Sequence, residues 1–300
     1  MDKMKNIAVI GLGLMGTPFA TLLLKSGFHV TGYDIIKKKI TNLVPLGLNP
    51  AGSPQEAAKK ADLIMLSLLN WGIVQEVVEG KEGVIRSAKK GQIIIDTSTV
   101  PPWETRDMAK RLAKKGIEWM DVPVCGSSAK AKKGDMIFMA GGKKSTYNRI
   151  KPVLEKISKK TIYAGKHGHA AMLKLVHNQI LYLNQIAAIE GFSVGLKAGL
   201  DPDVMMDLLE SADASSDIIK ARGRDMLCGD FSPKGPVWVA IKDIETILEN
   251  AKRLGVVAPV AGLYHQLLLQ ARYNDWESSD ATVVLKIYEN LAGIRKKGHS

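Results

Sequence analysis

The N-terminal segment VIGLGLMGTPFATLLLKSGFHVTGYD (residues 9–34) constrains the fold more than any other part of the sequence. Gly11, Gly13 and Gly16 follow a short β-branched run, a helical pattern comes next, and a second such run ends at Asp34. The first glycine permits a tight turn, the second lets a pyrophosphate approach a helix N-terminus, and the third allows close helix–strand packing. The segment therefore predicts a dinucleotide-binding strand–helix–strand unit, although a plain turn without nucleotide is the alternative.

Asp34 indicates which dinucleotide is bound. It lies about 20 residues beyond the glycines, the offset at which an acid binds the ribose 2′-hydroxyl of NAD. A carboxylate at this place repels the 2′-phosphate of NADP, whereas Lys37, Lys38 and Lys39 could attract one. We therefore predict NAD as the cofactor and keep NADP as the alternative.

Strand and helix patterns alternate in the first half of the chain. The strand patterns cover residues 6–11, 29–34, 63–68, 92–97, 118–124 and 136–142. The helical patterns cover residues 14–26, 54–60, 73–88, 103–115 and 145–159. Such alternation predicts parallel strands joined by crossover helices, and hence a doubly wound, Rossmann-type α/β domain over residues 1–165.

Helical patterns dominate the chain after a last strand pattern at residues 161–165. They cover residues 168–197, 202–212, 216–227, 239–254, 259–273 and 280–294. The sequence thus predicts an all-α domain over residues 166–300, joined to the first by a long helix. Because that helix is apolar nearly all round, we expect it to be central and packed on several sides.

Composition limits the functional classes. The net charge is +12, but the lysines are dispersed in pairs and no basic segment is interleaved with aromatic residues, so nucleic acid is not the expected partner. No run reaches the roughly 18 apolar residues of a membrane span, and no secretory segment opens the chain. The 2 cysteines, Cys125 and Cys228, lack metal-ligand or disulfide spacing. We expect a cytoplasmic protein with neither membrane nor structural metal.

The segment KHGHAAMLKLVHNQ (residues 166–179) places polar groups on the long apolar helix. Lys174 and Asn178 are one turn apart and share a face. A partly buried lysine can give and take a proton, because burial disfavours its charged form. The alternative is a lysine whose head reaches water. His167, His169 and His177 have no accompanying carboxylate before Glu190, so we expect no metal site.

The whole set of motifs resembles the β-hydroxyacid dehydrogenase family, which includes 3-hydroxyisobutyrate dehydrogenase and tartronate semialdehyde reductase. The resemblance covers nearly the whole chain. It rests on GLGLMG (11–16), DTST (96–99), DVPVCGSSAKAKKGDMIFMAGG (121–142), GKHGHAAMLKLVHN (165–178) and KDIETILENAKRLGVVAPV (242–260).

The resemblance implies roles for individual residues. Catalysis falls to Lys174 as general acid/base with Asn178 beside it. The implied cofactor-binding residues are Gly11, Leu12, Gly13, Leu14, Met15, Gly16, Asp34, Leu68, Leu69, Thr99 and Lys242. The implied substrate-binding residues are Ser98, Cys125, Gly126, Ser127, Lys174, Asn178, Phe231, Trp238 and Asp243. Association into a homodimer or homotetramer is also implied.

Three departures from the family pattern fall near the implied site. Cys125-Gly126-Ser127 stands where Ser-Gly-Gly is common, Ala170 replaces a glycine, and His177 replaces the first of two asparagines. We interpret Cys125 as a thiol that lines the pocket, because no clear activating base accompanies it for covalent catalysis.

The sequence thus predicts an NAD-dependent oxidoreductase that interconverts a small β-hydroxy acid and its semialdehyde by hydride transfer. The expected substrate is small and anionic. A related imine reductase or decarboxylating hydroxyacid dehydrogenase is one alternative. The other is a non-catalytic dinucleotide-binding or basic chromatin-associated module.

Overall fold

The computed structural model describes residues 4–294 and divides the chain into two compact units between Lys174 and Leu175. The first unit holds a β-sheet with its helices, and the second is built of helices. The long helix α8 (His169–Lys197) begins in the first unit and continues in the second. The predicted combination of a doubly wound sheet with a helical domain is confirmed.

The sheet of the first unit is parallel over most of its width. Its strands are β1 (Asn6–Ile10), β2 (His29–Tyr33), β3 (Asn49–Pro50), β4 (Leu63–Leu66), β5 (Ile93–Asp96), β6 (Glu118–Asp121), β7 (Val124–Cys125), β8 (Ile137–Gly141) and β9 (Lys160–Gly165). Their order is β3-β2-β1-β4-β5-β6-β8-β7, with β9 beside β8. The order reverses between β1 and β4, and such sheets bind ligands beyond the carboxyl ends of their strands at this point.

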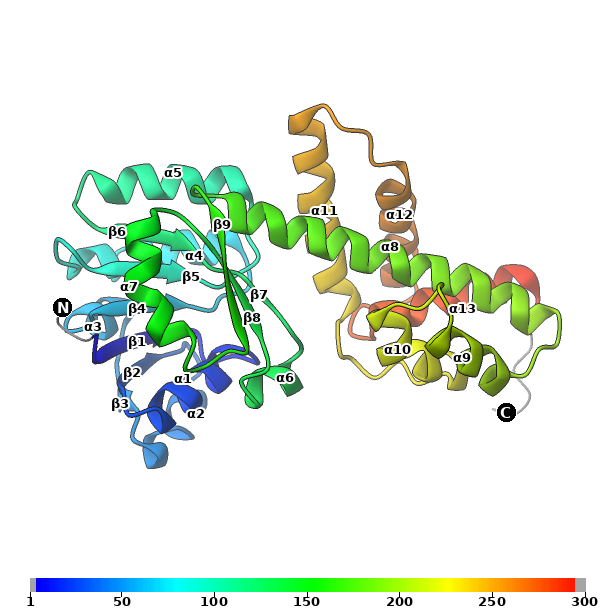
Figure 1. Ribbon diagram of the computed structural model, residues 1–300, viewed down its shortest axis with the longest axis horizontal. Helices are drawn as coiled ribbons and strands as arrows, with labels where there is room; N and C mark the ends of the chain where they lie inside the picture. Colours follow the sequence, from blue (N-terminus) through cyan, green and yellow to red (C-terminus); the bar gives the residue numbers. More distant parts are fainter. Residues whose placement is uncertain (1–3, 295–300) are drawn as a thin grey trace. The chain divides into compact units, whose positions relative to one another are not determined.

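Helices cover both faces of this sheet (Figure 1). They are α1 (Gly16–Lys25), α2 (Lys37–Thr41), α3 (Pro54–Ala58), α4 (Trp71–Glu79), α5 (Pro102–Ala113), α6 (Ser128–Lys132) and α7 (Lys144–Leu154). Alternate residues of β1 enter different cores: Ile7 and Val9 join the core that includes α1 and α7. Ala8 and Ile10 join the core that includes α3, α4 and α5. Burial on both faces explains why the strand sequences are apolar runs.

Two predicted elements of the first unit are interrupted. The helix expected over residues 73–88 ends at Glu79, and a separate 3-10 turn follows at Val84–Arg86. Gly80 takes an extended conformation just after the helix, at a position where a Cβ would lie 2.3 Å from the Glu76 carbonyl oxygen. The strand expected over residues 118–124 is divided into β6 and β7. Both are antiparallel to β8, so this edge departs from the expected parallel order.

The second unit packs its helices around one apolar core. Besides most of α8, they are α9 (Pro202–Ser211), α10 (Asp217–Cys228), α11 (Val237–Leu254), α12 (Pro259–Tyr273) and α13 (Leu285–Ala292), with a 3-10 turn at Ala281–Val284. That turn replaces the start of the helix expected over residues 280–294. Gly255 ends α11 with a φ of +68°, and Pro259 begins α12, so local chemistry makes the α11–α12 hairpin.

Helix α8 is less enclosed than its composition suggests. Phe192 and Ile189 are buried in the core of the second unit, whereas Ile180 and Val194 are exposed by 56% and 72%. The expected packing on several sides is therefore wrong for this face, which is apolar but open. Between residues 4 and 294, no helix has the length and hydropathy needed to cross a membrane.

Candidate functional site

The glycine loop after β1 gives its three glycines different surroundings. A Cβ on Gly11 would lie 2.2 Å from the Ser67 carbonyl oxygen, and one on Gly16 would lie 1.8 Å from the Gly11 carbonyl oxygen. Gly13 has no heavy atom within 4 Å of the place where a Cβ would stand. The outer glycines are therefore required by packing, while the middle one faces open space at the start of α1. Helix α1 has no side-chain cap and no acid in its first turn, which leaves its N-terminus suited to an anion.

Asp34 joins the end of β2 to this loop. Its carboxylate is buried and accepts the Leu12 amide at 2.8 Å and the Ile36 amide at 2.9 Å. The Lys39 ammonium lies 3.3 Å from the same carboxylate. Asp34 therefore orders the glycine loop and also places a negative charge beside it. Lys39, one of the three lysines that could attract a 2′-phosphate, partly balances that charge.

The ends of β4 and β5 bring Leu68 and Ser98 together. The Ser98 hydroxyl accepts the Leu68 amide at 3.0 Å, and the Ser98 amide donates to Asp96 at 2.9 Å. Thr99 follows at an intermediate exposure, and Leu69 is largely exposed. These predicted residues therefore lie at the carboxyl edge of the sheet, as does the glycine loop.

Asp121 holds the start of α8 against the end of β6. It is almost fully buried, and its two carboxylate oxygens accept the amides of Gly168 and Ala171, each at 2.9 Å. Close approach is needed here, because a Cβ on Gly141 would lie 2.6 Å from an Asp121 oxygen. The sequence motifs around residues 121, 141 and 168 therefore meet in one place and set the direction of the lysine helix.

Lys174 lies one turn beyond this anchor, and its Nζ donates to Sγ of Cys125 at 4.0 Å. Both side chains are partly buried. Gly126 follows with a φ of +142°, and the Ser127 hydroxyl accepts the Lys130 amide at 3.3 Å, so that it caps α6. The structure thus brings Lys174 to the segment in which the family pattern is altered.

Asn178 belongs to a buried polar network of the second unit. Its amide group donates to Asp243 at 2.8 Å, and the Tyr182 hydroxyl donates to the same carboxylate oxygen at 3.1 Å. Lys242 lies 3.0 Å from the other oxygen of Asp243. Burial raises the pKa of Tyr182 well above its usual value of 10.0, and the charge of Asp243 adds to this, so Tyr182 remains a donor. The network fixes the orientation of the Asn178 amide.

The remaining predicted residues occupy varied surroundings in the second unit. Phe231 belongs to the apolar core, where the Lys286 ammonium lies 5.1 Å from the centre of its ring. Trp238 is 37% exposed, and its backbone amide donates to the Glu277 carbonyl at 3.3 Å. Phe231 is thus a packing residue of the second unit in this structure.

The three histidines near Lys174 make separate contacts. His167 pairs with the Trp119 carbonyl at 3.0 Å, His169 with the Ala164 carbonyl at 3.3 Å, and His177 with the Asn178 side-chain oxygen at 3.0 Å. Within residues 4–294, no group of three or more histidine, cysteine or acidic side chains is arranged to hold a metal ion.

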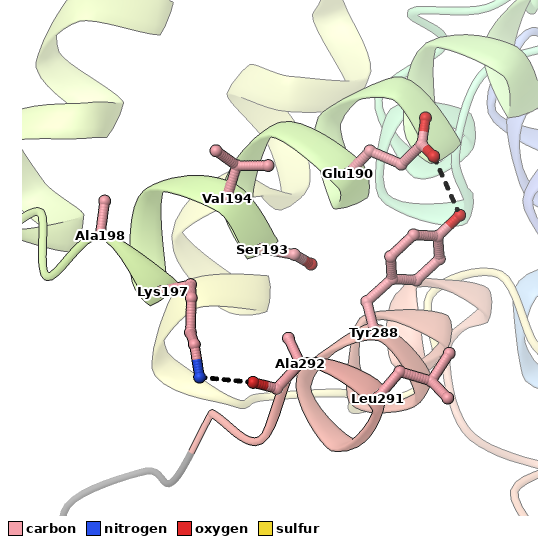
Figure 2. Close-up of a pocket in the computed structure, with 8 residues that line it drawn as sticks. All are labelled: Glu190, Ser193, Val194, Lys197, Ala198, Tyr288, Leu291 and Ala292. Atoms are coloured by element: carbon pink, nitrogen blue, oxygen red, sulfur yellow. Dashed lines mark hydrogen bonds between the residues drawn. The ribbon is translucent and has the colours of Figure 1, made fainter.

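A cavity of about 610 Å³ lies elsewhere, between α8 and α13 in the second unit (Figure 2). Two hydrogen bonds join its lining residues: Lys197 donates to the Ala292 carbonyl at 2.6 Å, and Tyr288 donates to Glu190 at 3.4 Å. Val194 and Leu291 supply apolar walls. None of the predicted site residues lines this cavity. We therefore do not assign the candidate site to it, despite its volume.

Comparison with known proteins decides the family. A family model described as the NAD binding domain of 6-phosphogluconate dehydrogenase matches residues 6–165. A second, described as the NAD-binding of NADP-dependent 3-hydroxyisobutyrate dehydrogenase, matches residues 168–288. The 2-(hydroxymethyl)glutarate dehydrogenase of Eubacterium barkeri is 32% identical over 299 residues, which cover 99% of each chain. The chain belongs to the β-hydroxyacid dehydrogenase family.

Other members of the β-hydroxyacid dehydrogenase family match over similar lengths. The 3-sulfolactaldehyde reductase of Escherichia coli K12 is 31% identical over 296 residues, covering 98% of this chain and 99% of its own. The crystal structure of 3-hydroxyisobutyrate dehydrogenase from Salmonella typhimurium matches with a TM-score of 0.86 and 27% identity, covering 94% of this chain and 99% of its own. The resemblance predicted from the motifs is confirmed.

Two structurally important residues of this family member were given no role by sequence reasoning. Asp121 lies inside a quoted motif, yet its partners are 47 and 50 residues away, so only the fold could reveal that it caps α8. Tyr182 continues the spacing of Lys174 and Asn178 by one more turn, and this repeat could have indicated that Tyr182 shares their face of the helix.

Proposed function

We propose that this family member is an NAD-dependent oxidoreductase that interconverts a small β-hydroxy acid and its semialdehyde. The observation that carries the proposal is the Nζ of Lys174, held 4.0 Å from Cys125 on a helix whose start is anchored by Asp121. The same unit carries the glycine loop. Family membership supports the reaction class, because the relatives are named as dehydrogenases and reductases of hydroxy acids and aldehydes.

The glycine loop and the sheet edge would hold the dinucleotide. Gly13 leaves the space that a pyrophosphate needs, and the uncapped start of α1 offers amide donors. Asp34 would accept a ribose hydroxyl, while Leu68 and Thr99 would border the nicotinamide. When bound, the nicotinamide supplies or accepts the hydride. We propose NAD over NADP because the buried Asp34 carboxylate would repel a 2′-phosphate, even with Lys39 beside it.

Lys174 would manage the proton of the substrate oxygen. Its ammonium would donate to the carbonyl oxygen as an aldehyde is reduced, and the neutral amine would accept the hydroxyl proton in the reverse direction. Asn178 lies one turn farther along α8, and its amide is held by Asp243. We assign Asn178 an orienting role toward the substrate hydroxyl or the lysine.

The substrate would be small and anionic. The loop formed by Cys125, Gly126 and Ser127 lies next to Lys174, and its backbone amides suit a carboxylate. Ser98 accepts the Leu68 amide, which leaves the proton of its own hydroxyl for another acceptor. Because Cys125 and Ser127 differ from the common family residues, we expect a substrate preference that is not inherited from 3-hydroxyisobutyrate dehydrogenase.

A substrate panel tests the proposed reaction class. Purified enzyme is mixed with NAD and hydroxy acids, including 2-(hydroxymethyl)glutarate and 3-hydroxyisobutyrate, or with NADH and semialdehydes, including 3-sulfolactaldehyde, and absorbance of NADH is followed. We expect turnover with at least one β-hydroxy acid or its semialdehyde. Turnover of cyclic imines alone would replace the proposal with an imine reductase.

Lys174→Ala tests the assigned proton transfer. Loss of a general acid/base reduces turnover by about 100- to 10,000-fold. Binding of NADH, measured by its fluorescence, should persist. Lys166→Ala removes an exposed lysine just before the same helix and is the matched control, with turnover close to that of the wild type. Equal turnover in the two variants would refute the role of Lys174.

We also propose that the enzyme is a homodimer or homotetramer. Val176, Ile180 and Val194 of α8 are apolar and exposed by 44%, 56% and 72%. A second copy presents the same stripe, so association about a two-fold axis would remove both stripes from water. Light scattering measures the molar mass of the wild type and of Ile180→Glu. A wild-type mass equal to that of one chain contradicts the proposal.

A further inference from the structure

Cys125 and Lys174 form a contact pair, and the proposed hydride transfer requires no reaction between these two side chains. They are 49 residues apart in sequence, and both belong to the first unit. Neither cysteine of the chain is in a disulfide, and the second one, Cys228, lies in the other unit. An amine next to a thiol is a distinct chemical arrangement, because a nitrogen nucleophile can condense with an oxidised thiol.

The contact is built into the fold. Asp121, on the strand just before the cysteine segment, accepts the amides of Gly168 and Ala171 at the start of the lysine helix. Cys125 itself is held by the pairing of β7 with Ile137 of β8. The backbones that carry the two groups are thus fixed to each other, and the flexible lysine side chain alone must move to bring nitrogen to sulfur.

We propose that Cys125 and Lys174 are a peroxide-dependent modification site that closes to a sulfenamide, a covalent sulfur–nitrogen bond between their side chains. The thiolate is the form of cysteine that reacts with peroxide, and the Lys174 Nζ lies 4.0 Å from the Cys125 sulfur. Partial exposure of both residues gives a small oxidant access.

The reaction balances in two steps. The Cys125 thiolate attacks hydrogen peroxide, so that a sulfur–oxygen bond forms, the oxygen–oxygen bond breaks and hydroxide leaves; sulfur is oxidised and peroxide is reduced by two electrons. The Lys174 amine, after loss of its proton, then attacks sulfur. The nitrogen–sulfur bond forms, the sulfur–oxygen bond breaks, and the departing hydroxide takes a proton to become water. One peroxide is consumed and no second oxidant is needed.

The bond would stop catalysis reversibly. The bond occupies the Lys174 amine, to which proton transfer is assigned. The expected loss of activity therefore rests on the proposed function, whereas formation of the bond does not depend on it. Excess thiol reduces the sulfenamide to the original thiol and amine, with formation of a disulfide of the reductant.

Mass spectrometry of the full chain tests the proposal. Cys228→Ser protein, in which Cys125 is the remaining cysteine, is treated with hydrogen peroxide and measured intact. We expect a species about 2 Da lighter, which thiol treatment returns to the original mass. Tryptic digestion should join the peptide of residues 116–130 to that of residues 167–197, because a modified Lys174 blocks cleavage.

Two further variants separate this bond from other products. Cys125→Ser in the same background should show no lighter species. Lys174→Arg keeps a cation but removes the reactive amine, so we expect a sulfenic acid about 16 Da heavier, trapped by dimedone, and no lighter species. A lighter species in Lys174→Arg would show that sulfur bonds a backbone nitrogen instead, and would overturn the proposal. Sulfenic or higher acids alone in the Cys228→Ser protein would also overturn it, whatever the enzyme's substrate is.

Discussion

Single residues in this enzyme combine structural and chemical tasks. Asp34 accepts the Leu12 amide and so holds the glycine loop, while its charge is proposed to select the ribose of the cofactor. Asp243 accepts Asn178 and Tyr182 together and so fixes an amide of the lysine helix. At such a residue, two different substitutions must be compared to separate the structural task from the chemical one.

Asp34 offers such a separation. Asp34→Asn keeps an oxygen acceptor for the Leu12 amide but removes the charge, whereas Asp34→Ala removes both. We expect both variants to narrow the preference for NAD over NADP, measured as the ratio of kcat/KM for the two cofactors. We expect Asp34→Ala alone to lose about 1–3 kcal/mol of unfolding free energy, because a buried amide is left unpaired. A cofactor ratio unchanged in both variants removes Asp34 from the ribose site.

Tyr182→Phe tests the network around Asp243. The change removes one donor to the carboxylate and preserves the ring, so we expect a lower kcat and a loss of about 1–3 kcal/mol in unfolding free energy. Tyr264→Phe is the matched control, because its hydroxyl accepts Gln185 at 2.7 Å and leaves Asp243 untouched. Stopped-flow turnover and urea denaturation measure the two effects. Equal losses of kcat in both variants would indicate a general packing effect.

At the scale of elements, the start of α8 depends on one carboxylate. Asp121→Ala leaves the amides of Gly168 and Ala171 without their acceptor, at a cost of about 1–3 kcal/mol for each buried amide. Asp121→Asn retains one acceptor oxygen and should cost less. Urea denaturation gives the order of stabilities, and we expect turnover to fall with it because Lys174 lies one turn beyond the anchor. Full stability and turnover in Asp121→Ala would contradict this.

Local signals explain which elements could be predicted from the sequence. The strand, glycine loop and helix around Gly11, Gly13 and Gly16 depend on contacts within a short segment, and the prediction of this segment is confirmed. The division of residues 118–124 into two strands depends on pairing with β8, which comes later in the chain. The hydrogen-bond partners of Asp121 and Asp243 are similarly distant in the sequence. The motifs that contain these two residues therefore indicated the region of the site but could not predict its contacts.

At the scale of the molecule, two buried tyrosines make stability sensitive to alkali. Burial raises the pKa of Tyr182 and of Tyr264 above the usual value of 10.0. Below pH 10 neither state loses these protons; above it the unfolded chain does and the folded chain does not, so stability falls as pH rises. Each tyrosine contributes a slope of about 1.4 kcal/mol per pH unit.

Urea denaturation at pH of about 9, 10 and 11 measures this slope. The double variant Tyr182→Phe/Tyr264→Phe should show a shallower decline than the wild type, because its unfolded state no longer gains from ionising these residues. The other side chains are the same in both proteins, so the difference between the two declines isolates the two tyrosines. Parallel declines would show that the two tyrosines ionise in the folded state as well.

The three glycines of the loop are required for two different physical reasons. Gly11 and Gly16 are enclosed by neighbouring backbone, so a side chain at either position would clash with that backbone and disturb the fold. Gly13 faces open space, so a side chain there would spare the fold and obstruct only an incoming pyrophosphate. Of the three glycines, Gly13 is thus the one at which a side chain would separate nucleotide binding from folding.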